Sequence, residues 1–178
     1  MRHARLAAIL FVSIHSLTFP MKTLAQTLLA DDDRRDALIA NCVALIEQQV
    51  AARGPIRRLA LSAGIGLLNA VKPGALQRAV SALLPDFADA LDPLYRQFQQ
   101  SQSTDFSRFI DEHSAVATHA LIGVTDRRMQ ASGNAAVRAA YARLRSTAEN
   151  EVRAALPGLG RILDQRLKSD ALGPRRRG

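Results

Sequence analysis

The feature that most constrains the fold is a stripe of apolar residues that recurs every three or four positions across residues 76–98. Its members are Leu76, Val80, Leu83, Phe87, Leu91, Leu94 and Phe98. This spacing keeps the side chains on one face of an α-helix, which predicts a helix packed against a core. Pro85 and Pro93 fall within the stripe. Because proline lacks an N–H donor, we expect kinks or short breaks between stacked helices there.

Stripes of the same period cover most of the chain. One follows the acidic cap at 31–33, a second follows a cap at Thr104, and two more flank Pro157-Gly158, where we expect an interruption. Their members are Ile39, Val43, Ile46 and Val50; Phe106, Phe109, Ile110, Val116, Ala120 and Val124; Val137, Tyr141, Leu144, Ala148, Val152 and Leu156; and Leu159, Ile162, Leu163 and Leu167. No segment alternates like a strand, and no internal repeat of fixed period is found. We therefore predict an all-α fold, a compact bundle of about six to eight helices.

Residues 56–71 form the segment on which this architecture depends. Their apolar side chains keep one helical phase, at Ile56, Ala60, Ala63, Leu67 and Val71. A helix-turn-helix regulator resembling tetracycline-repressor-type proteins would instead turn at Gly64 and read DNA with residues 65–70. Only Asn69 in that stretch has a side chain suited to base edges. We therefore expect a buried central helix around which the other helices pack.

The chain divides into three parts. Residues 1–20 are a leader, either a mis-called start ahead of Met21 or a signal peptide, and their apolar stretch is too short to cross a bilayer. Residues 21–168 are predicted to form a single helical domain, and residues 169–178 a disordered basic tail. We expect a cytoplasmic protein, or an exported one if residues 1–25 are a signal peptide.

Basic charge is concentrated toward the C-terminus. The net charge of +8 arises entirely after residue 126, where 12 basic side chains face 4 acidic ones. Five of these arginines could contact nucleic acid or an anionic membrane surface: Arg127, Arg128, Arg138, Arg145 and Arg153. The alternative is a solvated helix face on which Glu149 and Glu151 pair with Arg145 and Arg153.

No group of residues indicates catalysis or metal binding, so we assign no catalytic, cofactor or metal site. His113 and His119 are spaced poorly for one metal ion, and Cys42 lies in an apolar stripe, which is typical of an inert thiol. Three aspartates, Asp86, Asp89 and Asp92, recur on what we interpret as the solvated face of a helix. The sequence leaves enzymatic activity undecided and favours a protein without it.

Several short segments resemble a family of small uncharacterised bacterial proteins, found mainly in actinobacteria. The resemblance rests on "AVKPGALQRAVSALLPDF", "ALDPLY", "VTDRR" and "RAALPGLG", and it covers roughly residues 21–166. It implies a compact all-helical domain of unknown function and transfers no activity.

The function that we expect is therefore a non-enzymatic one. The first hypothesis is a helical protein that acts through contacts with a protein partner or in a homo-oligomer. The alternatives are a DNA-binding regulator of the helix-turn-helix class and a peripheral envelope or membrane-surface protein that uses the basic region.

Overall fold

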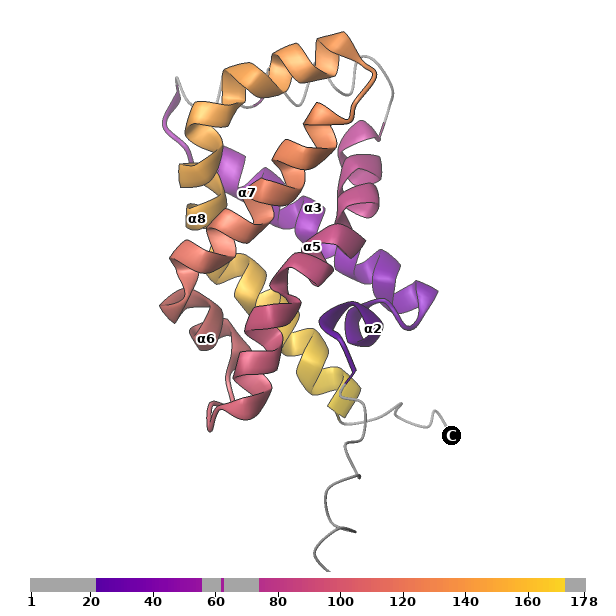
Figure 1. The fold of residues 1–178 in the computed structure, drawn as a ribbon, viewed down its shortest axis with the longest axis vertical. Helices are drawn as coiled ribbons and strands as arrows, with labels where there is room; N and C mark the ends of the chain where they lie inside the picture. Colours follow the sequence, from indigo (N-terminus) through magenta and orange to yellow (C-terminus); the bar gives the residue numbers. More distant parts are fainter. Residues whose placement is uncertain (1–21, 56–61, 63–73, 172–178) are drawn as a thin grey trace, which may run out of the picture.

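A computed structural model describes residues 22–55, 62 and 74–171, and in these residues every regular element is a helix (Figure 1). The helices are α2 (Leu24–Leu28), α3 (Asp32–Ala51), α5 (Ala75–Gln100), α6 (Phe106–Glu112), α7 (Ser114–Gln130) and α8 (Ala135–Ala171). The predicted all-α fold is confirmed. The expected central helix at 56–71 lies outside the described residues apart from Ser62, as do the leader and residues 172–178.

Local capping explains where the first helices begin. The Thr23 hydroxyl accepts the N–H of Gln26, whose side chain accepts the N–H of Thr23 in return, so a helix of only five residues has a complete capping box. The Asp31 carboxylate accepts the N–H of Asp33, as the acidic cap predicts. The predicted cap at Thr104 is wrong by one residue, since Asp105 is the N-cap of α6 and accepts the N–H of Arg108.

Neither long helix breaks at its prolines. Helix α8 continues through Pro157-Gly158 to Ala171, so the interruption expected there is wrong. Helix α5 continues through Pro85 and Pro93, so of the two alternatives expected there, kinks or short breaks, the short breaks are wrong. A proline inside a helix costs on the order of 3 kcal/mol, which burial of apolar side chains on both sides can offset. Buried leucines flank Pro85 and Pro157: Leu84, Leu91, Leu156 and Leu163.

The chain breaks instead at His113, which ends α6 and begins α7. The stripe expected to continue through Val116, Ala120 and Val124 therefore changes direction at this residue. Val124 is buried, but Val116 is 57% exposed and the prediction for it is wrong.

The two long helices organise the bundle. Helix α5 packs against α2, α3 and α7, while α8 packs against α3, α6 and α7 and changes direction along its length (Figure 1). Helix α8 ends at Ala171, three residues beyond the expected end of the domain at residue 168. Asp170, near the end of α8, forms an ion pair of 2.8 Å with Arg34 at the start of α3. The buried core draws on all six of these helices, and α5 contributes Leu84, Ala88, Leu91, Leu94 and Tyr95 to it.

Each short helix is held by a buried aspartate from a long helix. Asp92 Oδ1 accepts the N–H of Leu24 at 2.8 Å, and Asp164 Oδ1 accepts the N–H of Phe106 at 3.0 Å. Both aspartate residues are buried, with 9% of each residue exposed. The interpretation of Asp92 as part of a solvated polar face is therefore wrong, because the carboxylate is needed at a helix N-terminus inside the bundle.

Candidate ligand cavity

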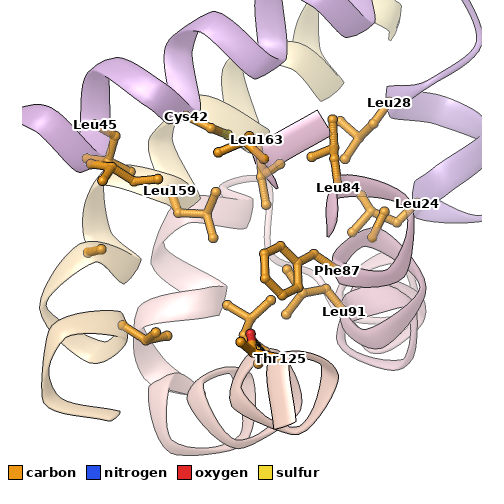
Figure 2. Close-up of a pocket in the computed structure, with 16 residues that line it drawn as sticks. Leu24, Leu28, Cys42, Leu45, Leu84, Phe87, Leu91, Thr125, Leu159 and Leu163 are labelled. Atoms are coloured by element: carbon orange, nitrogen blue, oxygen red, sulfur yellow. Dashed lines mark hydrogen bonds between the residues drawn. The ribbon is translucent and has the colours of Figure 1, made fainter. Parts of the chain in front are cut away.

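An apolar cavity of about 170 Å³ lies in the core, bounded by α2, α3, α5, α7 and α8. Figure 2 shows Leu24, Leu28 and Leu84 on one side of it, Leu45 and Leu159 on the other, and the Phe87 ring between them. The lining residues are Leu24, Leu28, Cys42, Leu45, Ile46, Val80, Leu84, Phe87, Ala88, Leu91, Leu121, Thr125, Val152, Ala155, Leu159 and Leu163. Apart from Cys42 and Thr125, all of these side chains are hydrocarbon.

The two heteroatoms in the wall add little polarity. The Thr125 hydroxyl already donates to the carbonyl oxygen of Leu121, with an oxygen–oxygen distance of 3.3 Å. Burial raises the pKa of the Cys42 thiol to about 11, so the thiol is neutral near pH 7. The expectation of a buried Cys42 is confirmed. The described lining residues therefore offer a ligand dispersion contacts, and none of them carries a charge near pH 7.

Gly158 leaves room for the Leu45 side chain of α3 against α8. A Cβ at this position would overlap the Cδ1 atom of Leu45 on α3. The absent side chain lets Leu45 lie against α8, where it closes one wall of the cavity. Gly158 thus has a packing role inside a continuous helix, in place of the expected interruption.

Most of the arginines predicted to contact an anionic surface have partners within the protein. Arg128 lies 2.6 Å from Asp86 and also donates to the carbonyl oxygen of Ala82. Arg145 makes two hydrogen bonds to Asp126, of 2.7 and 2.9 Å.

Two further arginines of that group also have partners in the protein. Arg153 pairs with Glu149 at 3.4 Å, and Arg138 donates to the carbonyl oxygen of Ser132. Arg127 lies in the last turn of α7.

The expected alternative pairing is therefore only partly realised. Glu149 pairs with Arg153 rather than with Arg145, and Glu151 lies 2.6 Å from Arg53 on α3. Phosphate binding at Arg128 or Arg145 would compete with ion pairs that join one helix to another.

His113 and His119, the histidines within the described residues, do not converge. His113 stacks on Phe109 with ring centroids 4.2 Å apart, and its Nδ1 lies 2.8 Å from the carbonyl oxygen of Phe109. His119 is exposed on α7. Within residues 22–55, 62 and 74–171, no three ligands of the His, Cys, Asp and Glu types gather as a metal site would require.

Comparison with known proteins gives one match. The sequence model of a family of unknown function (DUF6918) matches residues 24–167. Neither a curated protein nor a solved structure matches the chain. In the part of the chain that the structure describes, no helix is long and apolar enough to cross a membrane.

Proposed function

The chain belongs to the family of unknown function DUF6918, and we propose that it is a non-catalytic binding protein that takes one small, uncharged apolar molecule into the core cavity. The observation that carries the proposal is the cavity itself. Protein interiors are packed about as densely as organic crystals, and a void of 170 Å³ forfeits many contacts that a ligand would restore.

The volume sets the size of the ligand. An apolar cavity of about 150 Å³ engineered into another protein stays dry and binds benzene. A cavity of about 170 Å³ therefore suits a single ring with a short substituent, or a branched hydrocarbon of similar volume. Drug-sized molecules occupy pockets of roughly 300 Å³ or more, so larger ligands are disfavoured.

The lining sets the polarity of the ligand. An unpaired amide or hydroxyl moved from water into such surroundings loses roughly 2–7 kcal/mol, and a charged group loses far more. None of the described residues that line the cavity carries a cation or an anion that would compensate. Carboxylates, phosphates and amines are therefore excluded from the inside of the cavity.

Benzene and toluene are suitable probes for a test by backbone-amide NMR titration. We expect saturable shifts with one ligand per chain, centred on residues of α3, α5 and α8 that line the cavity. Ala155→Leu places three additional carbon atoms in the space and should weaken binding at least about tenfold. The matched control is Ala154→Leu, one position along the same helix on its exposed side, which should bind as the wild type does.

Two results would contradict the proposal. One is the absence of saturable shifts in the wild type. The other is equal affinity of Ala155→Leu and Ala154→Leu for the probes, which would place the bound molecule elsewhere.

The earlier hypotheses stay predictions with tests of their own. Action through protein contacts, including self-association, is tested by sedimentation of the purified chain. Among described residues, Val116 is the large apolar side chain that is exposed. Salt-dependent retardation of DNA would support the regulator hypothesis, and sedimentation with anionic vesicles would support the membrane-surface hypothesis. Mass spectrometry of the native N-terminus tests the predicted cytoplasmic location.

A further inference from the structure

The two long helices carry the same series of residues. In α5, Leu84-Pro85 is followed seven positions later by Leu91-Asp92, and then by Arg96. In α8, Leu156-Pro157 is followed at the same distances by Leu163-Asp164, and then by Lys168. Every member of the second series lies 72 residues after its counterpart.

The two aspartates also make the same pair of contacts. Asp92 accepts the N–H of Leu24, the first residue of α2, and lies 2.6 Å from Arg96 Nε. Asp164 accepts the N–H of Phe106, the first residue of α6, and lies 2.6 Å from Lys168 Nζ. Leu24 and Phe106 are both 0% exposed. We shall call each such group an aspartate clamp.

The helices around the clamps correspond in order and in packing. Each clamp joins a short capped helix to a long helix, with α3 or α7 between them in the chain. Helix α3 packs against α8 as α7 packs against α5, and α2 touches α8 as α6 touches α5. This exchange of neighbours is what a two-fold axis between two related units produces.

We infer that the chain is a tandem duplication of one helical unit, 23–100 and 105–171, and that the cavity is a single site shared by the two units across a pseudo-two-fold axis. The cavity walls support this arrangement, because corresponding residues face it from both units. Three such pairs are Val80 and Val152, Phe87 and Leu159, and Leu91 and Leu163. The statement about the site rests on the proposed function, whereas the duplication does not.

Unequal connections explain why no fixed period is found in the sequence. The first residues of the short helices are 82 residues apart, whereas the clamps are 72 apart. Part of the difference lies between the short and middle helices, where three residues separate α2 from α3 and His113 alone separates α6 from α7. The correspondence between the two units is therefore clearer from the contacts of their helices than from the residue spacing in the sequence.

An exchange of corresponding side chains tests the inference in the full chain. Phe87→Leu enlarges the cavity and should by itself lower the melting temperature by roughly 3–8 °C. Leu159→Phe adds a ring at the corresponding position, where the cavity has room for it. Because the positions correspond, the double variant should recover to within about 2 °C of the wild type. The control pairs Phe87→Leu with Leu28→Phe. Leu28 lines the same cavity from α2 but does not correspond to Phe87, so this pair should show no recovery.

Benzene titration of the exchanged variant separates this inference from the proposed function. If the exchanged variant recovers its stability and still binds benzene, both the duplication and the proposed function are supported. If the double variant recovers its stability but neither it nor the wild type binds benzene, the duplication is supported and the proposed function is overturned. Recovery with Leu28→Phe equal to that with Leu159→Phe would overturn the inference, because proximity alone would then explain it.

Discussion

The Cys42 thiol is the reactive group closest to the cavity, and burial determines its chemistry. With its pKa raised to about 11, the thiolate fraction at pH 8 is roughly one hundredfold lower than that of a free cysteine. We predict that a disulfide reagent modifies the native protein slower by about that factor than the unfolded protein, followed by absorbance of the released thiol. Because Cys42 lines the cavity, saturating benzene should slow the reaction further. A rapid burst in the native protein would contradict this account.

Asp126 is the acceptor that ties α7 to α8. Hydrogen bonds from Arg145 and then Tyr141 lower the pKa of the Asp126 carboxyl, while burial and the bond to Asp126 raise the pKa of Tyr141 to about 12. Because the folded-state pKa of Asp126 lies below its ordinary value, the ionised carboxylate stabilises the fold at pH values above about 4. That contribution is lost as the pH falls through the folded-state value.

The lowered pKa of Asp126 predicts how the stability of the fold depends on pH. Asp126→Asn should lower the melting temperature at pH 7. The difference in melting temperature between this variant and the wild type should become smaller as the pH is lowered toward 3. Asp89→Asn, which removes an exposed carboxylate from α5, is the control and should change little. Ultraviolet titration gives a second readout, since Asp126→Asn should shift the ionisation of Tyr141 to lower pH. An unchanged Tyr141 titration would contradict the assigned hydrogen bond.

At the scale of elements, the aspartate clamps hold the short helices. A helix of five or seven residues is too short to be stable alone, so α2 and α6 depend on their contacts with α5 and α8. Asp92→Asn and Asp164→Asn each keep an acceptor but remove the charge, leaving Arg96 or Lys168 without its clamp partner. We expect each variant to lose about 1–3 kcal/mol of unfolding free energy, measured by urea denaturation.

Amide hydrogen exchange then shows which short helix each of the two variants destabilises. Asp92→Asn should speed exchange of the Leu24 amide and leave Phe106 protected, and Asp164→Asn should do the reverse. Asp111→Asn, on an exposed site of α6, controls for a general effect of charge. Equal loss of protection at both amides in either variant would mean that the clamps act through the whole fold.

Sequence periodicity predicts the helices well and their ends less well. The stripes through Ile39 and Phe87 identify core faces because a 3.6-residue period depends only on local geometry. The continuity of α5 and α8 through prolines escapes the same reasoning, since burial against other helices offsets the lost hydrogen bond. The role of Asp92 escapes it too, because the N–H that it accepts lies 68 residues away in the sequence.

The cavity is the hardest feature to predict. Several of its lining residues, such as Phe87, Val152 and Leu163, belong to apolar stripes that predict a packed core. The periodicity does not show that these side chains leave space between them. The available signal is the presence of small side chains, Ala88 and Ala155, among large ones on the long helices. Small residues are also common where helices pack closely, so the three-dimensional arrangement is needed to distinguish a void from a close contact.

At the scale of the whole molecule, the proposed duplication has a consequence for the order of the two units along the chain. Residues 101–104 join the end of α5 to the cap of α6. Two-fold symmetry places the end of α8 near the start of α2 in the same way, and the ion pair between Asp170 and Arg34 agrees with this placement. The order of the two units along the chain should therefore be interchangeable without a change of fold.

A circular permutant tests this claim. We predict that a chain opened between Gln102 and Ser103, with Ala171 joined to Thr23 through four residues in place of the terminal segments, folds with the same circular-dichroism spectrum. Its melting temperature should lie within a few degrees of the wild type, because the cut falls in a connection and the new link spans the distance that the symmetry fixes. The same permutation opened between Ala88 and Asp89, inside α5, should not fold. If the first permutant fails as completely as the second, the ends of the two units do not correspond, and the cavity lies between unrelated halves.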